Sequence, residues 1–306
     1  MKTVKTRFFS AISPPVTPSL SSPGPGDPMN HDEILRVNRR VYDSMAAQDD
    51  PLCRPAKDDE LVDPLRRVDA AGWLGDSIAG KRVLCLAAGG GRQSSLYCAA
   101  GADVTVVDLS GAMLELDRQV AAQRGLSLRL IETSMENLSM LQNDEFDIVV
   151  QPVSTCYIPD VRPVFAEVAR VLRGGGLYIS QHKQPVSLQA GVDPGREGNY
   201  HIEHRYYRDQ PIPSNRSNST VGRRLRETGA IEFLHRWEQL IGGMCRAGFV
   251  VEDLTEPLHA KQDAPIGSFA GRANFIAPYV RIKARRRESH SQKQSPAKSA
   301  LWVPES

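Results

Sequence analysis

The chain has 306 residues, of which 41% are hydrophobic and 24% are charged, as expected for an ordinary globular protein that can bury a full core. The sequence contains no run of about 18 apolar residues, so no membrane-spanning helix is predicted. Its five cysteines are scattered and form no C-x-x-C pair. The sequence therefore predicts neither a disulfide framework nor a zinc site, and it favours a reducing, cytoplasmic setting.

Both ends of the chain differ in composition from the middle. Residues 1–29 are rich in Pro, Ser and Gly, and residues 283–306 are basic without a hydrophobic period, so we expect both to be disordered and residues 30–282 to form the domain. The first segment holds three of the 38 basic residues and one of the 36 acidic residues, and the last segment holds six basic and two acidic residues. The middle therefore carries 29 basic and 33 acidic residues, a balance that does not favour nucleic acid as a partner.

The first predicted strand and helix enclose a run of glycines in VLCLAAGGGRQSS, Val83 to Ser95. The apolar run is typical of a buried strand, and Gly89-Gly90-Gly91 followed by polar residues is typical of a tight turn that opens a helix. Glycine lets the backbone approach a ligand, and free N–H groups at a helix start favour an electron-rich partner. The pattern indicates a nucleotide site, with close packing of a helix on a sheet as the structural alternative.

The following elements alternate between strand and helix. Strands are predicted at 103–107, 126–132, 146–151 and 177–181, and helices at 94–100, 110–125 and 160–172. Such alternation implies a doubly wound parallel α/β sheet, whose ligands bind beyond the carboxyl ends of the strands. Asp108 ends the second strand, 19 positions after Gly89. At this spacing a carboxylate can accept hydrogen bonds from both hydroxyls of an adenosine ribose.

The alternating pattern breaks after the fifth strand. Residues 183–231 have no clear period and predict an inserted cap, with Tyr200, His201 and Tyr206 as candidate substrate-binding side chains. A helix over 235–247 and strands over 249–254 and 274–282 follow. Pro278 within the last run indicates an edge or bulge position, because proline cannot donate a ladder hydrogen bond.

Five segments of the sequence carry a family resemblance. In order and spacing, VLCLAAGGGRQSS, GADVTVVDLS, FDIVVQ, VARVLRGGGLYIS and MCRAGFVVEDL resemble the class I S-adenosylmethionine-dependent methyltransferases, over Val83 to Leu254. The resemblance implies a Rossmann-like, seven-stranded and mostly parallel sheet with an antiparallel last strand. It also implies S-adenosyl-L-methionine as the cofactor. The predicted insertion has the size of a lid and contains tyrosines and histidines, which favours a small molecule as the methyl acceptor.

The resemblance further assigns a cofactor site. The glycine turn would hold the methionine part of the cofactor, the acid after the second strand its ribose, and residues after the third strand its adenine. The matching residues, with one at the end of the fourth strand, are Ala87, Gly89, Gly91, Asp108, Leu109, Met113, Met135, Glu136 and Gln151. Four positions depart from the family pattern: Cys85 and Ser134 stand where acids are usual, Ala87 stands where glycine is usual, and Gly174 stands where proline is usual.

Methyl transfer from a sulfonium is a direct displacement, so few catalytic side chains are required beyond those that align the acceptor and remove its proton. His235, before the sixth strand, and His182, beyond the fifth, are the candidate bases, with a capping or surface role as the alternative for each. Arg92 is a candidate partner for the cofactor carboxylate, with a free surface arginine as the alternative. Tyr42 on a predicted N-terminal helix is expected to face the cofactor, with a solvated helix face as the alternative. His201-x-x-His204 lacks a third ligand and does not indicate a metal site.

Two other functions fit parts of the pattern. A nicotinamide-dependent oxidoreductase also has a glycine turn and an acid about 20 residues later, but Ser94 stands where its third glycine is expected. A catalytically inactive cofactor-binding protein, or one that associates with RNA through Arg285-Arg286-Arg287, would keep the fold without the chemistry.

Overall fold

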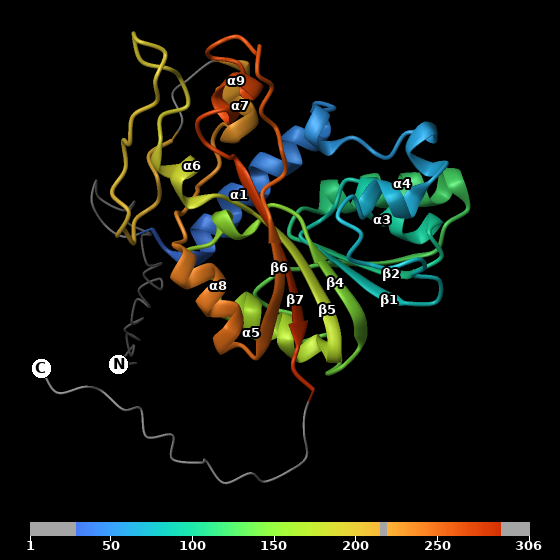
Figure 1. The fold of residues 1–306 in the computed structure, drawn as a ribbon. Coiled ribbons are helices and arrows are strands. Elements are labelled where there is room, and N and C mark those ends of the chain that lie inside the picture. Colours follow the sequence, from blue (N-terminus) through green and yellow to red (C-terminus); the bar gives the residue numbers. More distant parts are fainter. Residues whose placement is uncertain (1–28, 215–218, 289–306) are drawn as a thin grey trace, which may run out of the picture.

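A central sheet runs through the part of the chain that the computed structural model describes, residues 29–214 and 219–288. Within these residues seven strands form it in the order β3-β2-β1-β4-β5-β7-β6 (Figure 1). The strands are β1 (Arg82–Leu86), β2 (Asp103–Asp108), β3 (Leu128–Glu132), β4 (Phe146–Gln151), β5 (Leu172–Lys183), β6 (Phe249–Thr255) and β7 (Tyr279–Arg286). Residues 1–28 and 289–306, which the sequence predicts to be disordered, lie outside the described part.

The strand pairing has the predicted doubly wound pattern. β1 pairs in parallel with β2 and β4, β2 pairs with β3, and β4 pairs with β5. β7 is antiparallel to both of its neighbours, β5 and β6. The expected, mostly parallel sheet with an antiparallel last strand is confirmed. Parallel strands covered on both faces read as continuous apolar runs, and β1 and β2 are buried along nearly their whole length.

Helices cover both faces of the sheet (Figure 1). α3 (Arg92–Ala99) and α4 (Gly111–Arg124) lie on one face, where α2 (Pro64–Val68) packs against α3. α5 (Arg162–Val171) and α8 (Trp237–Arg246) cover the other, with Phe165 and Leu240 fully buried against Tyr178 of β5 and its neighbours. None of the helices in the described ranges is long and apolar enough to cross a membrane.

The N-terminal helix α1 (His31–Ala47) lies over the carboxyl-end edge of the sheet. Its buried Asn38 donates from Nδ2 to the backbone oxygens of Tyr157 (2.9 Å) and Ile231 (3.1 Å) and accepts from the Ile231 N–H at 2.8 Å. One amide thus ties α1 to η3 (Thr155–Tyr157) and to the chain that precedes α8. Two further 3-10 turns, η1 (Pro51–Cys53) and η2 (Asp58–Leu61), follow α1.

The cap above the carboxyl ends comes from two segments, whereas the sequence predicted one. The first, after β5, contains α6 (Pro185–Gln189) and α7 (Thr220–Leu225), and the second, between β6 and β7, contains α9 (Phe269–Ala273) (Figure 1). Arg272 of α9 is fully buried and joins them, because its guanidinium donates to the backbone oxygens of Gly191 (3.2 Å) and Ser187 (3.1 Å). The second segment has no periodic pattern, so sequence reasoning missed it.

The last strand extends past the predicted domain end at residue 282. β7 continues to Arg286, because the basic side chains there find acidic partners within the fold. Arg285 pairs with Glu252 of β6, and Arg286 pairs with Asp144. The predicted basic tail therefore begins later than the sequence suggests.

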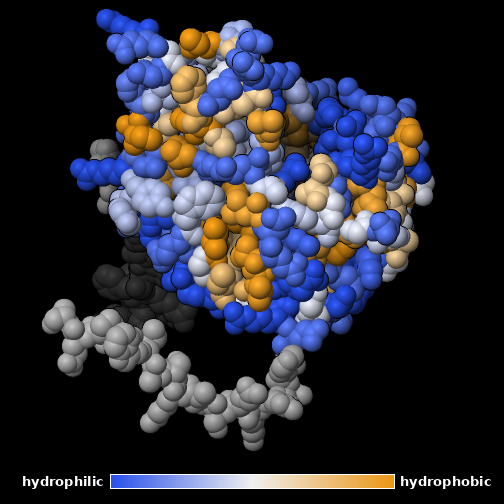
Figure 2. Space-filling model, viewed as in Figure 1, coloured by the Kyte–Doolittle hydropathy of each residue, from blue (hydrophilic) through white to orange (hydrophobic). Residues whose placement is uncertain are grey.

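The position predicted for Pro278 is wrong. β7 begins at Tyr279, after the proline, and lies between β5 and β6. The edge strand on this side is β6, and Figure 2 shows apolar side chains gathered over it, with Val250 and Leu254 exposed. Pro278 thus stands immediately before an interior strand, where its missing N–H costs no ladder hydrogen bond.

Candidate active site

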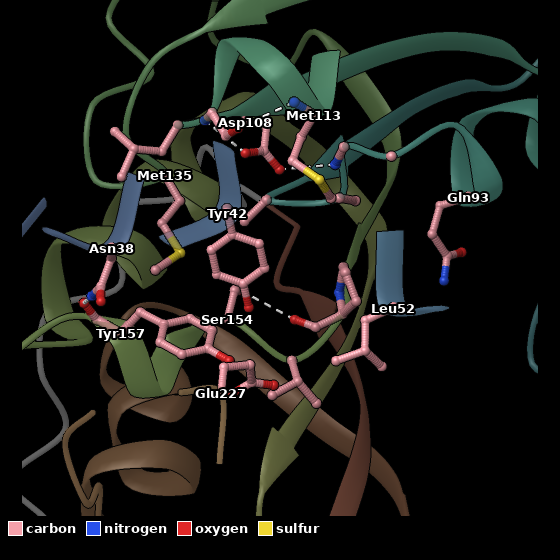
Figure 3. A pocket seen from close by; sticks show the side chains of 18 of the residues that line it. Asn38, Tyr42, Leu52, Gln93, Asp108, Met113, Met135, Ser154, Tyr157 and Glu227 are labelled. Atoms are coloured by element: carbon pink, nitrogen blue, oxygen red, sulfur yellow. Dashed lines mark hydrogen bonds between the residues drawn. The ribbon is translucent and has the colours of Figure 1, made fainter. Parts of the chain in front are cut away.

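A cavity of about 390 Å³ lies at the carboxyl ends of the parallel strands, bordered by α1 and the cap. Figure 3 shows Asp108 and Met113 toward one end and Tyr157 and Glu227 toward the other, with Tyr42 of α1 between them. We name these the glycine-turn end, which also includes Ala87 to Gly90, and the tyrosine end, which also includes Tyr279.

Asp108 is held by the backbone around it. Its Oδ2 accepts from the N–H of Gly89 (2.8 Å) and its Oδ1 from the N–H of Ser110 (2.9 Å). A Cβ at position 89 would lie 3.0 Å from Asp108 Oδ2 and 2.8 Å from Met113 Cβ, so only glycine lets the turn approach the carboxylate this closely. Burial raises the pKa of Asp108, and the two N–H donors oppose that rise. A carboxylate offers about four lone-pair positions, so roughly two remain for donors in the cavity.

A second carboxylate, which sequence reasoning missed, holds the rest of the glycine turn. Asp117 of α4 is fully buried and accepts from the N–H groups of Gly90 (2.9 Å) and Gly91 (3.1 Å) and from the Ser94 hydroxyl. Burial raises the pKa of Asp117 to about 7. These amides therefore face a protein carboxylate, and Gly91 does not line the cavity. The signal was an acid on the apolar face of the predicted helix, four positions after Met113.

Most of the predicted cofactor residues meet at the glycine-turn end. Those that line the cavity are Ala87, Gly89, Asp108, Leu109, Met113 and Met135. Glu136 instead pairs with His31, whose Nε2 lies 3.1 Å from Glu136 Oε2. Gln151 is buried, and its amide donates to Met135 Sδ at 3.2 Å. Ser134, where an acid is usual in the family, lines the cavity beside Met135.

Two arginines border the glycine-turn end and share one buried carboxylate. Arg54 Nη1 and Arg92 Nη2 each lie 2.8 Å from an oxygen of Glu60. The hydrogen bond from Arg54, with that from Arg92, holds the pKa of Glu60 well below its ordinary value although burial opposes this. Glu60 thus fixes both guanidinium groups at the rim. Its segment is polar without a period, so the sequence contained no signal for it.

The two candidate bases lie in the interior and outside the cavity lining. The ring nitrogens of His182 are each 2.8 Å from a hydroxyl, those of Thr155 and Ser180, and His235 Nε2 donates to the backbone oxygens of Thr155 (2.9 Å) and Ile158 (3.0 Å). Burial lowers the pKa of His182 to about 3 and also lowers that of His235. Both rings are neutral, buried and already hydrogen-bonded within the protein. Neither histidine is therefore placed to act as a base on a molecule in the cavity.

The cap residues predicted to bind substrate also lie outside the cavity lining; they are Tyr200, His201 and Tyr206. The ring of Tyr200 packs against that of Phe275, with 5.6 Å between the centroids, and the Tyr206 hydroxyl accepts from the N–H of Trp237 at 3.4 Å. The cap reaches the cavity through Arg224 and Glu227 instead. Both residues lie in a part of the cap without a hydrophobic period, which is why sequence reasoning missed them.

The tyrosine end combines aromatic rings with one carboxylate. The rings of Tyr42 and Tyr157 meet edge to face, with 5.5 Å between their centroids. Burial and, next, the charge of Glu227 raise the pKa of both phenols well above its ordinary value. Both hydroxyls therefore stay neutral, so each can donate a hydrogen bond to a ligand but cannot act as a base. The expectation that Tyr42 faces the cavity agrees with its place in the lining.

Four buried charged side chains stand behind this end, and we call them the Lys183 network: Lys183, Arg226, Glu227 and Glu232. Lys183 Nζ lies 2.7 Å from Glu227 Oε2 and also bonds to Glu232, which pairs with Arg226. Burial opposes the charge of Lys183, but the two carboxylates outweigh it and raise the pKa of Lys183 well above its ordinary value. Two bases thus balance two acids in the Lys183 network, and Lys183 holds Glu227 Oε2 in place.

Comparisons with known proteins agree with this geometry. A family model described as a methyltransferase domain matches residues 84–180, which include the glycine turn and Asp108. The uncharacterized methyltransferase YbaJ of Bacillus subtilis (strain 168) is 37% identical over 181 residues, 58% of this chain and 69% of that protein. The ubiquinone biosynthesis O-methyltransferase of Bordetella avium (strain 197N) is 31% identical over 129 residues, 42% of this chain and 53% of the relative.

The solved structures show the same fold. An S-adenosylmethionine dependent methyltransferase from Mesorhizobium loti superposes with a TM-score of 0.58 at 22% identity, over 74% of this chain and 100% of that one. The Bacillus relative is matched over more than two thirds of its length, and the matched family segment contains the carboxylate and glycines that border the cavity. The chain belongs to the class I S-adenosylmethionine-dependent methyltransferases, and its cofactor is S-adenosylmethionine.

Proposed function

We propose that this methyltransferase moves the methyl group of S-adenosylmethionine onto a small molecule held at the tyrosine end of the cavity. One observation carries the proposal: a continuous cavity joins Asp108 and the glycine turn at one end to Tyr157 and Glu227 at the other. Its volume of about 390 Å³ is that of a small-molecule site. α1 and the cap border the tyrosine end, which favours a small acceptor over a macromolecule.

The residues at the glycine-turn end fit the cofactor. Positions 89 and 90 carry no side chain where a Cβ would approach Met113 within 2.8 and 2.9 Å, so the backbone can border a ligand there. In this proposal Asp108 accepts the ribose hydroxyls with the lone pairs that its backbone donors leave over. Met113 and Met135 would border the adenine, and Arg92 would pair with the cofactor carboxylate.

When bound, the cofactor supplies a methyl group on a positively charged sulfur, which the lone pair of an acceptor can displace directly. The chain's own residues then have to align the acceptor, exclude water and receive its proton. Tyr42 lies between the two ends (Figure 3). Asn38, one turn earlier on α1, donates a hydrogen bond to the backbone oxygen of Tyr157. This bond fixes α1, which carries Tyr42, to the segment that carries Tyr157.

The setting of the protein is part of the proposal. The five cysteines are unpaired, and Cys53, Cys85 and Cys156 are buried, which supports a reducing, cytoplasmic location. Arg285 and Arg286 are engaged by acidic partners within the sheet region. That engagement supports the view that nucleic acid is not the substrate.

Calorimetric titration of the purified chain with S-adenosylhomocysteine and with NADH tests the cofactor site. We expect the first to bind and the second not to bind. A cell extract supplied with a labelled methyl donor then identifies the acceptor from the mass of the product. Binding of NADH alone would refute the proposal, and label found only on protein or nucleic acid would refute the small acceptor.

A further inference from the structure

The hydroxyl of Tyr157 is buried at the tyrosine end without a hydrogen-bond partner among the described residues. Tyr157 is only 7% exposed, and Asn38 holds its backbone oxygen at 2.9 Å, so the ring cannot easily turn toward water. A buried hydroxyl without a partner costs about 1–3 kcal/mol. A bound molecule with an oxygen at this place would supply the missing acceptor, which makes the hydroxyl a ligand-binding group.

Glu227 offers a hydrogen-bond acceptor in the same cavity, which complements the Tyr157 donor. Among the described residues, Lys183 bonds to its Oε2 at 2.7 Å and leaves Oε1 for a donor in the cavity. Figure 3 shows the Glu227 side chain beside that of Tyr157 at this end. The tyrosine end therefore presents one neutral O–H donor and one carboxylate acceptor, a pair that a hydroxyl group can satisfy by donating and accepting at once.

The charges around Glu227 disfavour a cationic ligand. The Lys183 network already balances the carboxylate with buried bases. Arg224 borders the same cavity and adds a positive charge. A protonated amine would meet a carboxylate whose charge is offset and a further cation nearby, whereas a neutral hydroxyl meets no such repulsion.

We propose, on the basis of the function proposed above, that the acceptor is a neutral aromatic hydroxyl compound, whose O–H donates to Glu227 and whose oxygen accepts from Tyr157. The rings of Tyr42 and Tyr157 favour a flat, apolar body. Glu227 takes up the hydroxyl proton while that oxygen forms its bond to the methyl carbon. The methyl–sulfur bond breaks, and sulfur keeps its electron pair. Lys183 positions Glu227 for this step.

A binding test uses the full chain saturated with S-adenosylhomocysteine and 4-methylphenol as the probe. NMR titrations compare it with toluene, which lacks the hydroxyl, and with benzylamine, which is cationic. We expect 4-methylphenol to bind at least about tenfold more tightly than either, which corresponds to one net hydrogen bond. Tyr157→Phe and Glu227→Gln should each abolish this preference.

Matched controls change the same residue types outside the cavity. Tyr206→Phe and Glu238→Gln should keep the preference for 4-methylphenol, because neither side chain lines the cavity. The affinity of each variant for S-adenosylhomocysteine reports whether its fold is intact. With a labelled methyl donor, Glu227→Gln should also lower kcat for a phenolic acceptor by about 100-fold or more, the usual contribution of a general base.

The contrary results are separate for the two proposals. Three results would overturn the assignment of an aromatic hydroxyl acceptor. They are equal binding of 4-methylphenol and toluene, tighter binding of benzylamine, and a preference for 4-methylphenol that persists in both Tyr157→Phe and Glu227→Gln. Failure of the wild-type chain to bind S-adenosylhomocysteine would instead overturn the proposed function itself.

Discussion

The two ends of the cavity are assembled from the chain in different ways. Apart from Arg54 at its rim, the glycine-turn end comes from residues between Ala87 and Met135, which lie at or after the ends of the parallel strands β1, β2 and β3. The tyrosine end joins α1, the turn after β4, the cap and β7, and the contact of Asn38 with Tyr157 spans 119 positions. One end is local in sequence and the other is not.

The two ends also hold their acids differently. Backbone amides hold Asp108 and Asp117 at the glycine-turn end, whereas buried bases hold Glu227 and Glu232 at the tyrosine end. Backbone donors depend on the turn geometry alone, so that end is constrained by the sheet. Side-chain partners depend instead on how the cap packs against Lys183, the last residue of β5. In the proposed function, the cavity would therefore separate a cofactor site set by the topology of the sheet from an acceptor site set by tertiary contacts.

The largest effect is expected from Lys183→Met. The change would leave Glu227 and Glu232 buried without their shared cation, and breaking a buried ion pair costs about 3–5 kcal/mol. Urea unfolding should show a loss of this size, while the folded variant should bind S-adenosylhomocysteine as the wild type does. A loss below about 1 kcal/mol would show that the Lys183 network contributes no more than a surface ion pair.

Asp108→Ala should change the glycine-turn end of the cavity and weaken the binding of S-adenosylhomocysteine. Loss of charged hydrogen bonds of about 1.5–3 kcal/mol each should weaken S-adenosylhomocysteine by roughly 100-fold. Calorimetry measures this change. Asp103→Ala, at the exposed start of the same strand, is the matched control and should bind normally. Unchanged affinity in the Asp108 variant would mean that this carboxylate does not hold the ribose.

Asp117→Asn should change how stability depends on pH. The folded pKa of about 7 lies above the ordinary value of 3.8, so the stability from this group is present below pH of about 4 and is lost as pH rises through about 7. The asparagine cannot titrate. The free energy of unfolding of the Asp117→Asn variant, relative to that of the wild type, should therefore rise with pH in this window, by up to about 1.4 kcal/mol per pH unit. Urea unfolding at several pH values measures the slope, and parallel curves for the two proteins would contradict it.

The smallest effect is expected at Ala87, whose φ of +48° lies in the left-handed region. Ala87→Gly relieves strain of about 1–2 kcal/mol but gives the unfolded chain about 0.4–1 kcal/mol of extra freedom, so a net stabilisation between about 0 and 1.6 kcal/mol is expected. Ala122→Gly, at an exposed position in the last turn of α4, should instead lose up to about 0.5–1 kcal/mol. Thermal unfolding of both variants compares them, and an equal loss at both positions would contradict the strain at Ala87.

Errors in the sequence-based site follow the same division between the two ends. Asp108, Leu109 and Met113 line the cavity as predicted because they follow a strand whose end is visible in the hydrophobic pattern. His182 and His235 also follow or precede predicted elements, but which way a side chain faces depends on packing, and both face inward. Proximity to the carboxyl end of a strand is therefore a weaker guide than position in the turn that ends it.

The sequence by itself determined the parallel strands of the sheet and the glycines and Asp108 of the glycine-turn end, because hydrophobic period, glycine and a strand-ending acid are local properties of the chain. Only the tertiary structure decided the tyrosine end, where Tyr157, Glu227 and Lys183 meet. Their positions depend on how an irregular cap packs over the sheet, and an irregular segment has no period from which its contacts follow. The charge balance that holds Glu227 arises when distant segments are buried together, and no local pattern encodes it.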